Sequence, residues 1–73
     1  MSPSLPIVSG RATVRALAKV GFSEVSQRGS HVKLRDDAGK TVIVPFHREL
    51  ARGTLRSILR QAELTVEEFL ELL

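Results

Sequence analysis

The sequence predicts an α+β domain with the element order helix, three antiparallel strands, helix and short helix (α-β-β-β-α-α). Apolar residues recur at helical spacing near both ends of the chain, and three strand-like runs separated by glycine-containing turns lie between them. The 73 residues leave room for one small domain. Two main helices with apolar stripes can cover one face of a three-stranded sheet, with the short C-terminal helix beside them. We therefore expect the other face to stay open.

The first helix is predicted over residues 10–20. Ser9 is a suitable N-cap, because its hydroxyl can accept a hydrogen bond from a free backbone N–H group of the first turn. The helix is expected to end before Gly21, since glycine readily adopts the left-handed conformation in which many helices end. The apolar stripe is expected at Val14, Leu17 and Ala18.

Three strands are predicted, over residues 22–28, 31–35 and 41–44. Gly29-Ser30 suits a two-residue hairpin turn with glycine at the first central position. Asp36–Lys40 is rich in residues that tolerate turn geometry, and Pro45 ends the third strand. Because side chains alternate across a strand, His31, Lys33 and Arg35 are expected to share the open face.

Two further helices are predicted in the last third of the chain. The second helix covers residues 53–62, and its buried stripe is expected at Leu55, Ile58, Leu59 and Ala62. Thr65 opens the short third helix, and Glu68 three residues later completes a capping box. The apolar face of this helix is expected at Val66, Phe69, Leu70 and Leu73.

The composition narrows the class of protein. The chain has no cysteine, which fits a reducing compartment such as the cytoplasm. No apolar run approaches the roughly 20 residues of a membrane helix, and the first eight residues carry no basic residue, unlike a signal peptide. We therefore expect a cytoplasmic protein in which residues 1–8 form a flexible leader and residues 9–73 form one domain.

The net charge of +3 hides a strong asymmetry along the chain. Residues 11–60 hold all eleven Lys and Arg residues against four acidic residues, a net charge of +7, whereas residues 61–73 hold four Glu residues. Basic side chains recur every four residues in the two main helices, at Arg11, Arg15 and Lys19 and at Arg52, Arg56 and Arg60. A basic body favours a polyanionic partner, although such rows also commonly form a solvated helix surface.

His31, directly after the Gly29-Ser30 turn, is the strongest candidate for a catalytic residue. Imidazole can transfer a proton in either direction near neutral pH. In RNA cleavage it would take the proton of the attacking 2′-hydroxyl or give one to the leaving 5′-oxygen, a contribution of roughly 10²- to 10⁴-fold. Arg28, Lys33 and Arg35 would hold the phosphate, and the backbone N–H groups of Gly29-Ser30 could assist them. The alternative is an ordinary surface histidine.

Other chemistries have less support in the sequence. His47 could act as a complementary acid or base, but a loop histidine in this position more often hydrogen-bonds the backbone. No spacing of His, Cys or acidic residues matches a metal site, and no glycine-rich loop matches a phosphate site of a cofactor, so we expect neither. The three aromatic residues are expected in the core, so RNA would be recognised by backbone and shape. These residues are Phe22, Phe46 and Phe69.

With these residues in place, the chain from Ser9 to its end resembles the HicA toxin family of small bacterial and archaeal mRNA interferases. The ordered set of motifs is more specific than the Gly-Ser-His element alone. The motifs that carry the resemblance are Ser9-Gly10, Gly21-Phe22, Gln27–His31, Val44–His47, Gly53–Ala62 and Glu67–Phe69.

The resemblance implies a fold like that of a double-stranded RNA-binding domain. It also implies metal-independent cleavage of mRNA by the histidine of the Gly-Ser-His element, here His31. A HicB antitoxin is implied as the partner that blocks the toxin and takes part in repressing the operon. The chain departs from the family pattern at Val32, where many relatives have a second His or an aromatic residue. It departs again at Glu63, where many have Gly.

Two other functions are compatible with these residues. A non-catalytic module for structured RNA would use the same fold and basic surface, and it would bind labelled RNA without shortening it. A DNA-binding helix-turn-helix formed by the last two helices is disfavoured, because an acidic recognition helix would face the DNA phosphates. The acidic residues in question are Glu67, Glu68 and Glu71.

Overall fold

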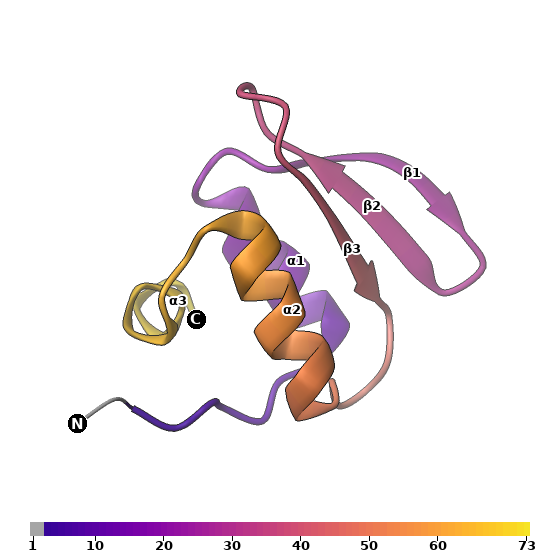
Figure 1. The fold of residues 1–73 in the computed structure, drawn as a ribbon. Helices are drawn as coiled ribbons and strands as arrows, with labels where there is room; N and C mark the ends of the chain where they lie inside the picture. The colour runs from indigo at the N-terminus through magenta and orange to yellow at the C-terminus, as the bar shows by residue number, and fades with distance from the viewer. Residues whose placement is uncertain (1–2) are drawn as a thin grey trace.

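The computed structural model describes residues 3–73 and shows an α+β domain in the predicted order (Figure 1). The elements are α1 (Gly10–Ala18), β1 (Ser23–Arg28), β2 (His31–Arg35), β3 (Thr41–Pro45), α2 (Arg52–Ala62) and α3 (Val66–Leu72). The strands form one antiparallel sheet in the order β1-β2-β3. The predicted fold class and element order are therefore confirmed, with boundaries that differ by one or two residues.

The core lies between the sheet and the two main helices. α1 and α2 occupy the same side of the sheet, and both pack against β3 (Figure 1). The sheet contributes alternate residues of β2 and β3 that are at most 1% exposed: Val32, Leu34, Val42 and Val44. Leu17 of α1, Leu55 of α2 and Phe69 of α3 meet them. Burying each such side chain contributes about 1.5–3 kcal/mol, so this layer supplies the main stabilisation of a small domain.

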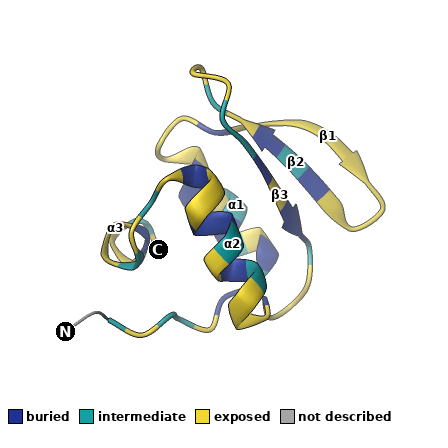
Figure 2. Ribbon diagram, viewed as in Figure 1, coloured by how far each residue is buried: buried dark blue, intermediate teal, exposed yellow. Residues whose placement is uncertain are grey.

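β1 lies beyond the area that the helices cover. All six of its residues are exposed, whereas β2 and β3 contain buried positions (Figure 2). Its register shifts at a bulge, because Glu24 pairs with Leu34 but Ser26 pairs with Lys33, which leaves Val25 as the extra residue. A bulge of this kind twists an edge strand and makes it a poorer template for pairing with another chain.

The N-terminus of α1 is held against the end of β3. Ser9 caps the helix as predicted, with its Oγ accepting from the Ala12 N–H at 3.0 Å. The Gly10 N–H donates to the His47 carbonyl at 2.9 Å. A Cβ atom on Gly10 would overlap the Pro45 carbonyl oxygen and would lie 2.9 Å from Phe46 Cα. Only glycine therefore permits this close approach of helix and strand.

Details of the predicted first helix are wrong. α1 ends at Ala18, with Lys19 as its C-cap, and Ala18 is exposed. Leu17 is buried as predicted and Val14 packs against the core, but the buried side of the helix is completed by Gly10, Thr13 and Ala16. Thr13 can occupy a buried position because its hydroxyl donates to the Ser9 carbonyl at 2.9 Å.

Three residues are less buried than predicted, one expected in the core and two expected on the apolar face of the third helix. Phe46 is only half-buried, because it follows the end of β3 at the rim of the helix layer. Leu70 and Leu73 are 37% and 50% exposed, since α3 is a terminal helix that rests on the core through Phe69, with Val66 and Leu72 packed beside it.

The segment before α1 runs along the helix layer. The Leu50 N–H donates to the Val8 carbonyl at 2.8 Å, and Leu5 packs against the core. The division between a leader of residues 1–8 and a domain of residues 9–73 stays a prediction, and residues 1 and 2 lie outside the described part. Within residues 3–73, no helix is long and apolar enough to span a membrane.

Candidate functional site

A hollow on the open face of the sheet brings together three of the predicted site residues. It has a volume of about 300 Å³ and is lined by Ser26, Arg28, His31, Lys33 and Ile43; we call it the His31 hollow. Arg28 pairs directly with His31 across the β1–β2 ladder. Because opposed residues of antiparallel strands project from the same face, the register itself places the Arg28 cation beside the imidazole.

The backbone of His31 is fixed on both sides, and its side chain is exposed. Gly29 has φ of 58°, the positive φ that the first central position of the predicted hairpin turn requires. On the other side, His31 pairs with Pro45, and the Phe46 N–H donates to the Ser30 carbonyl at 2.6 Å. A rigid central strand therefore presents an imidazole that is free to meet a ligand.

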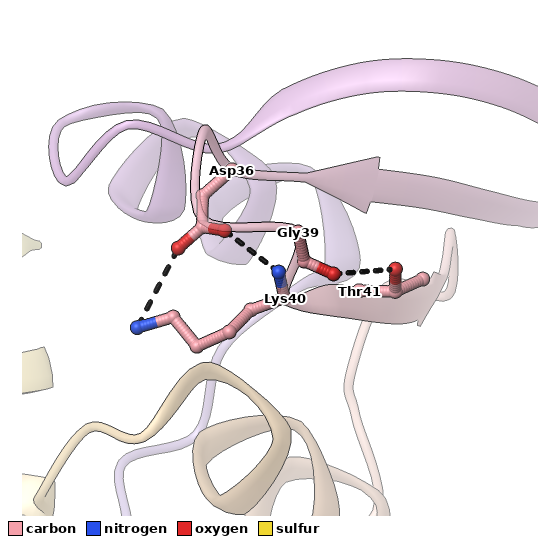
Figure 3. Close-up of polar contacts among 4 residues, drawn as sticks. All are labelled: Asp36, Gly39, Lys40 and Thr41. Carbon is pink, nitrogen blue, oxygen red and sulfur yellow. Dashed lines mark hydrogen bonds and ion pairs between the residues drawn. The ribbon is translucent and has the colours of Figure 1, made fainter.

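Arg35 lies at the other end of β2, outside the His31 hollow. Its Nε donates to Thr41 Oγ1 at 3.3 Å. The Thr41 hydroxyl donates in turn to the Gly39 carbonyl at 3.4 Å, as Figure 3 shows. Arg35 is therefore a tethered cation at the far end of the open face, a full strand length from His31.

Asp36, the first carboxylate after β2, is tied into the same turn. Its Oδ1 accepts from the Lys40 N–H at 2.8 Å, and its Oδ2 lies 3.5 Å from Lys40 Nζ (Figure 3). Because the Asp36 carboxylate is paired with Lys40, it has little effect on the positive electrostatic potential of the neighbouring strands.

Gly29 and Ser30 form the turn itself and do not line the His31 hollow. The Gly29 carbonyl accepts a hydrogen bond from Gln27 Nε2 at 3.1 Å, and the Ser30 carbonyl accepts one from the Phe46 N–H. The structure thus brings together Arg28, His31 and Lys33. The other predicted site residues, Gly29, Ser30 and Arg35, lie outside the hollow at the ends of β2.

The bulge at Val25 decides the charge of the open face. Strict alternation from Arg28 through Ser26 would put Glu24 on the face of His31. The extra residue instead pairs Glu24 with Leu34, on the helix-covered side, and pairs Ser23 with Arg35 on the open side. Among the residues that the ladders pair on the open face, none is a carboxylate.

Ser26 and Ile43 also line the His31 hollow, and the sequence reasoning missed both. Their places follow from the register, since each pairs with Lys33 from one side of β2. Both could have been found from strand alternation, Ile43 along β3 and Ser26 two residues before Arg28 along β1, because the bulge lies beyond Ser26.

His47 lies in a different hollow. It lines, with Ser9, Arg11, Phe46 and Arg48, a hollow of about 220 Å³ near the start of α1; we call it the His47 hollow. The two histidines therefore do not line a common hollow. Within residues 3–73, no three His, Cys, Asp or Glu side chains are grouped so that they could hold a metal ion.

The fold and the site define a small basic α+β domain that presents a histidine among cations on an open sheet. The family model of the HicA toxin, from bacterial toxin-antitoxin systems, matches residues 10–64. The match covers more than half of the chain and includes all the predicted site residues, so the chain belongs to the HicA toxin family. A search of curated proteins found no match.

Proposed function

We propose that this toxin is an endoribonuclease that cleaves mRNA without a metal ion, in the cytoplasm, with His31 as its catalytic residue. The pairing of Arg28 with His31 on an open face that is otherwise basic is the observation that supports this proposal most directly. A proton-transfer group beside fixed cations is what cleavage of a phosphodiester by the neighbouring 2′-hydroxyl requires.

In this mechanism the His31 imidazole accepts the proton of a 2′-hydroxyl, whose oxygen attacks the adjacent phosphorus. The bond between phosphorus and the 5′-oxygen breaks, and the 5′-oxygen takes a proton from solvent water, which the His31 imidazolium then restores by releasing its own proton. The products are a 2′,3′-cyclic phosphate and a 5′-hydroxyl. Arg28 and Lys33 contact the non-bridging oxygens, where negative charge grows during the attack. Arg35 holds a more distant part of the RNA backbone. The Gly29-Ser30 turn lies beside the bound RNA strand.

The decisive experiment compares the wild type with His31→Ala on labelled RNA. We expect the variant to lose at least 10²-fold in cleavage rate and to lose growth inhibition, with an unchanged circular dichroism spectrum. The wild type is expected to keep its full rate in EDTA. Cleavage by a clean preparation of His31→Ala would contradict the assignment, and a strict need for a divalent ion would contradict the metal-free mechanism. Binding of RNA without shortening by the wild type would indicate a binding module instead.

We further propose that a HicB-like antitoxin inhibits this site by covering it. The open face carries Lys33 beside His31 and Arg35 at its far end, so an acidic segment of the partner would be complementary to it in charge. Chemical modification of His31 by diethylpyrocarbonate should be fast in the free toxin and slow in the complex. Equal rates in the two states would exclude direct occlusion.

A further inference from the structure

The His47 hollow carries an inference that deepens the proposed function and rests on it. Arg11, His47 and Arg48 are all exposed and surround this hollow together with the half-buried ring of Phe46. Two arginines and a histidine thus line a space of about 220 Å³ that the proposed reaction does not use.

The backbone of this hollow is held rigidly. The His47 carbonyl accepts from the Gly10 N–H at 2.9 Å, and the Phe46 N–H donates to Ser30 at 2.6 Å. These bonds use main-chain groups of the loop and leave the imidazole of His47 exposed to solvent. The hollow is therefore part of the folded scaffold and not of a loose loop.

The positive charges around the hollow have no carboxylate partner in the described chain. The guanidinium carbon of Arg11 lies 5.3 Å from the centre of the Phe46 ring, and this contact orients the side chain without neutralising it. Over residues 3–73 the one ion pair is that between Lys40 and Asp36. Cations that are positioned but unpaired are suited to an anion from outside.

The two hollows adjoin along the chain. His31 pairs with Pro45 across the β2–β3 ladder, and Phe46 and His47 follow Pro45 directly. An RNA strand that places one phosphodiester at His31 can therefore continue past the end of β3 into the His47 hollow.

We propose that Arg11, His47 and Arg48 bind a backbone phosphate of the RNA that neighbours the phosphodiester cleaved at His31. Guanidinium and imidazole N–H groups donate to phosphate oxygens, and this contact fixes which bond along the strand lies at His31. These side chains hold the substrate in register, and proton transfer stays with His31.

The test measures RNA binding in a His31→Ala background, so that cleavage does not interfere. Fluorescence anisotropy with a labelled single-stranded RNA is recorded at several salt concentrations for this parent and for the same protein carrying Arg48→Ala. We expect about a tenfold loss of affinity and a salt slope smaller by about 0.7, the value for one lost phosphate contact to a single strand. In the protein with His31 intact, Arg48→Ala and His47→Gln are expected to raise KM and to leave kcat within about twofold.

The matched control is Arg15→Ala, which also removes one arginine. Arg15 lies on α1, one turn beyond Arg11. Arg15 faces another hollow, lined also by Ile7 and Leu72. Equal losses for Arg15→Ala and Arg48→Ala would show general electrostatic attraction and would overturn the proposal, as would an unchanged salt slope. A fall in kcat for His47→Gln as large as that for His31→Ala would overturn it too, because His47 would then transfer a proton. If the His31→Ala parent binds no RNA at all, the proposed function itself fails.

Discussion

Phe46 donates its backbone N–H to the carbonyl of Ser30 at 2.6 Å, so the loop after β3 is bonded to the turn that precedes His31. This bond extends the β2–β3 ladder past Pro45 and joins the His31 hollow to the His47 hollow. Gly10 at the start of α1 stands against the same segment. The position of His31 therefore depends on α1 as well as on its own hairpin.

Gly10→Ala should lower the stability of the toxin and its cleavage rate together. The added methyl group would meet the backbone of Pro45 and Phe46, which a side-chain movement cannot relieve. Overpacking of this kind costs about 1–3 kcal/mol, which urea unfolding would measure.

Gly53→Ala is the matched control for that prediction. A Cβ atom on Gly53, in the first turn of α2, would meet nothing within 4 Å. Alanine is the better helix former by up to about 1 kcal/mol, so we expect equal or higher stability. A similar loss for both variants would show that the contact between Gly10 and the end of β3 is not what constrains this position.

Ser23→Glu should weaken RNA binding without weakening the fold. The bulge pairs Ser23 with Arg35 on the open face, so the new carboxylate would neutralise that cation and repel phosphates. An opposite charge across the strands is itself mildly stabilising, by about 0.2–1 kcal/mol. We expect RNA affinity to fall several-fold and the salt slope to decrease, as measured by anisotropy. Ser23→Gln should bind like the wild type, and equal effects of the two substitutions would contradict the charge argument.

Glu63→Gly should raise stability. Glu63 ends α2 in the left-handed conformation, with φ of 59° and ψ of 42°, and is the one non-glycine residue with positive φ in residues 3–73. This conformation costs a residue with a Cβ atom roughly 1 kcal/mol or more, and glycine avoids it. The urea midpoint should rise accordingly. Glu67→Gly, inside α3, should lower it by about 0.5–1 kcal/mol, and a fall for both variants would contradict the strain at Glu63.

The capping box of α3 should make stability depend on acid. The Thr65 backbone N–H donates to Glu68 Oε1 at 2.8 Å, and this bond, with the contact to the Thr65 side chain, lowers the pKa of Glu68 below its ordinary value of 4.5. A lowered pKa means that the stabilisation is present at neutral pH and is lost as the pH falls from about 4.5 through the lower value of the folded state.

Glu68→Gln should therefore show a smaller loss of stability than the wild type between pH 5 and acid pH. Urea unfolding at a series of pH values measures this, and glutamine keeps an acceptor for the Thr65 N–H. Glu71→Gln in the last turn of the same helix serves as the comparison. An acid dependence that disappears equally in both variants would argue against the capping box as its source.

Features that depend on neighbouring residues were predictable from the sequence. The Ser9 cap, the Gly29-Ser30 turn and the pair Thr65 and Glu68 each act over four residues or fewer, and the structure contains all of them. The alternation of β2 likewise placed His31 and Lys33 on one face, and the family membership followed from motifs in order along the chain.

Other features were decided only by the tertiary structure. The bulge that takes Glu24 off the open face depends on how β1 pairs with β2, and the requirement for Gly10 depends on β3, more than thirty residues later in the chain. The separation of His47 from His31 also follows from register and packing. The residue types and local periods determined which elements form and which side chains could act. Contacts between segments distant in sequence determined which charges meet, because pairing register and close packing are properties of two segments together.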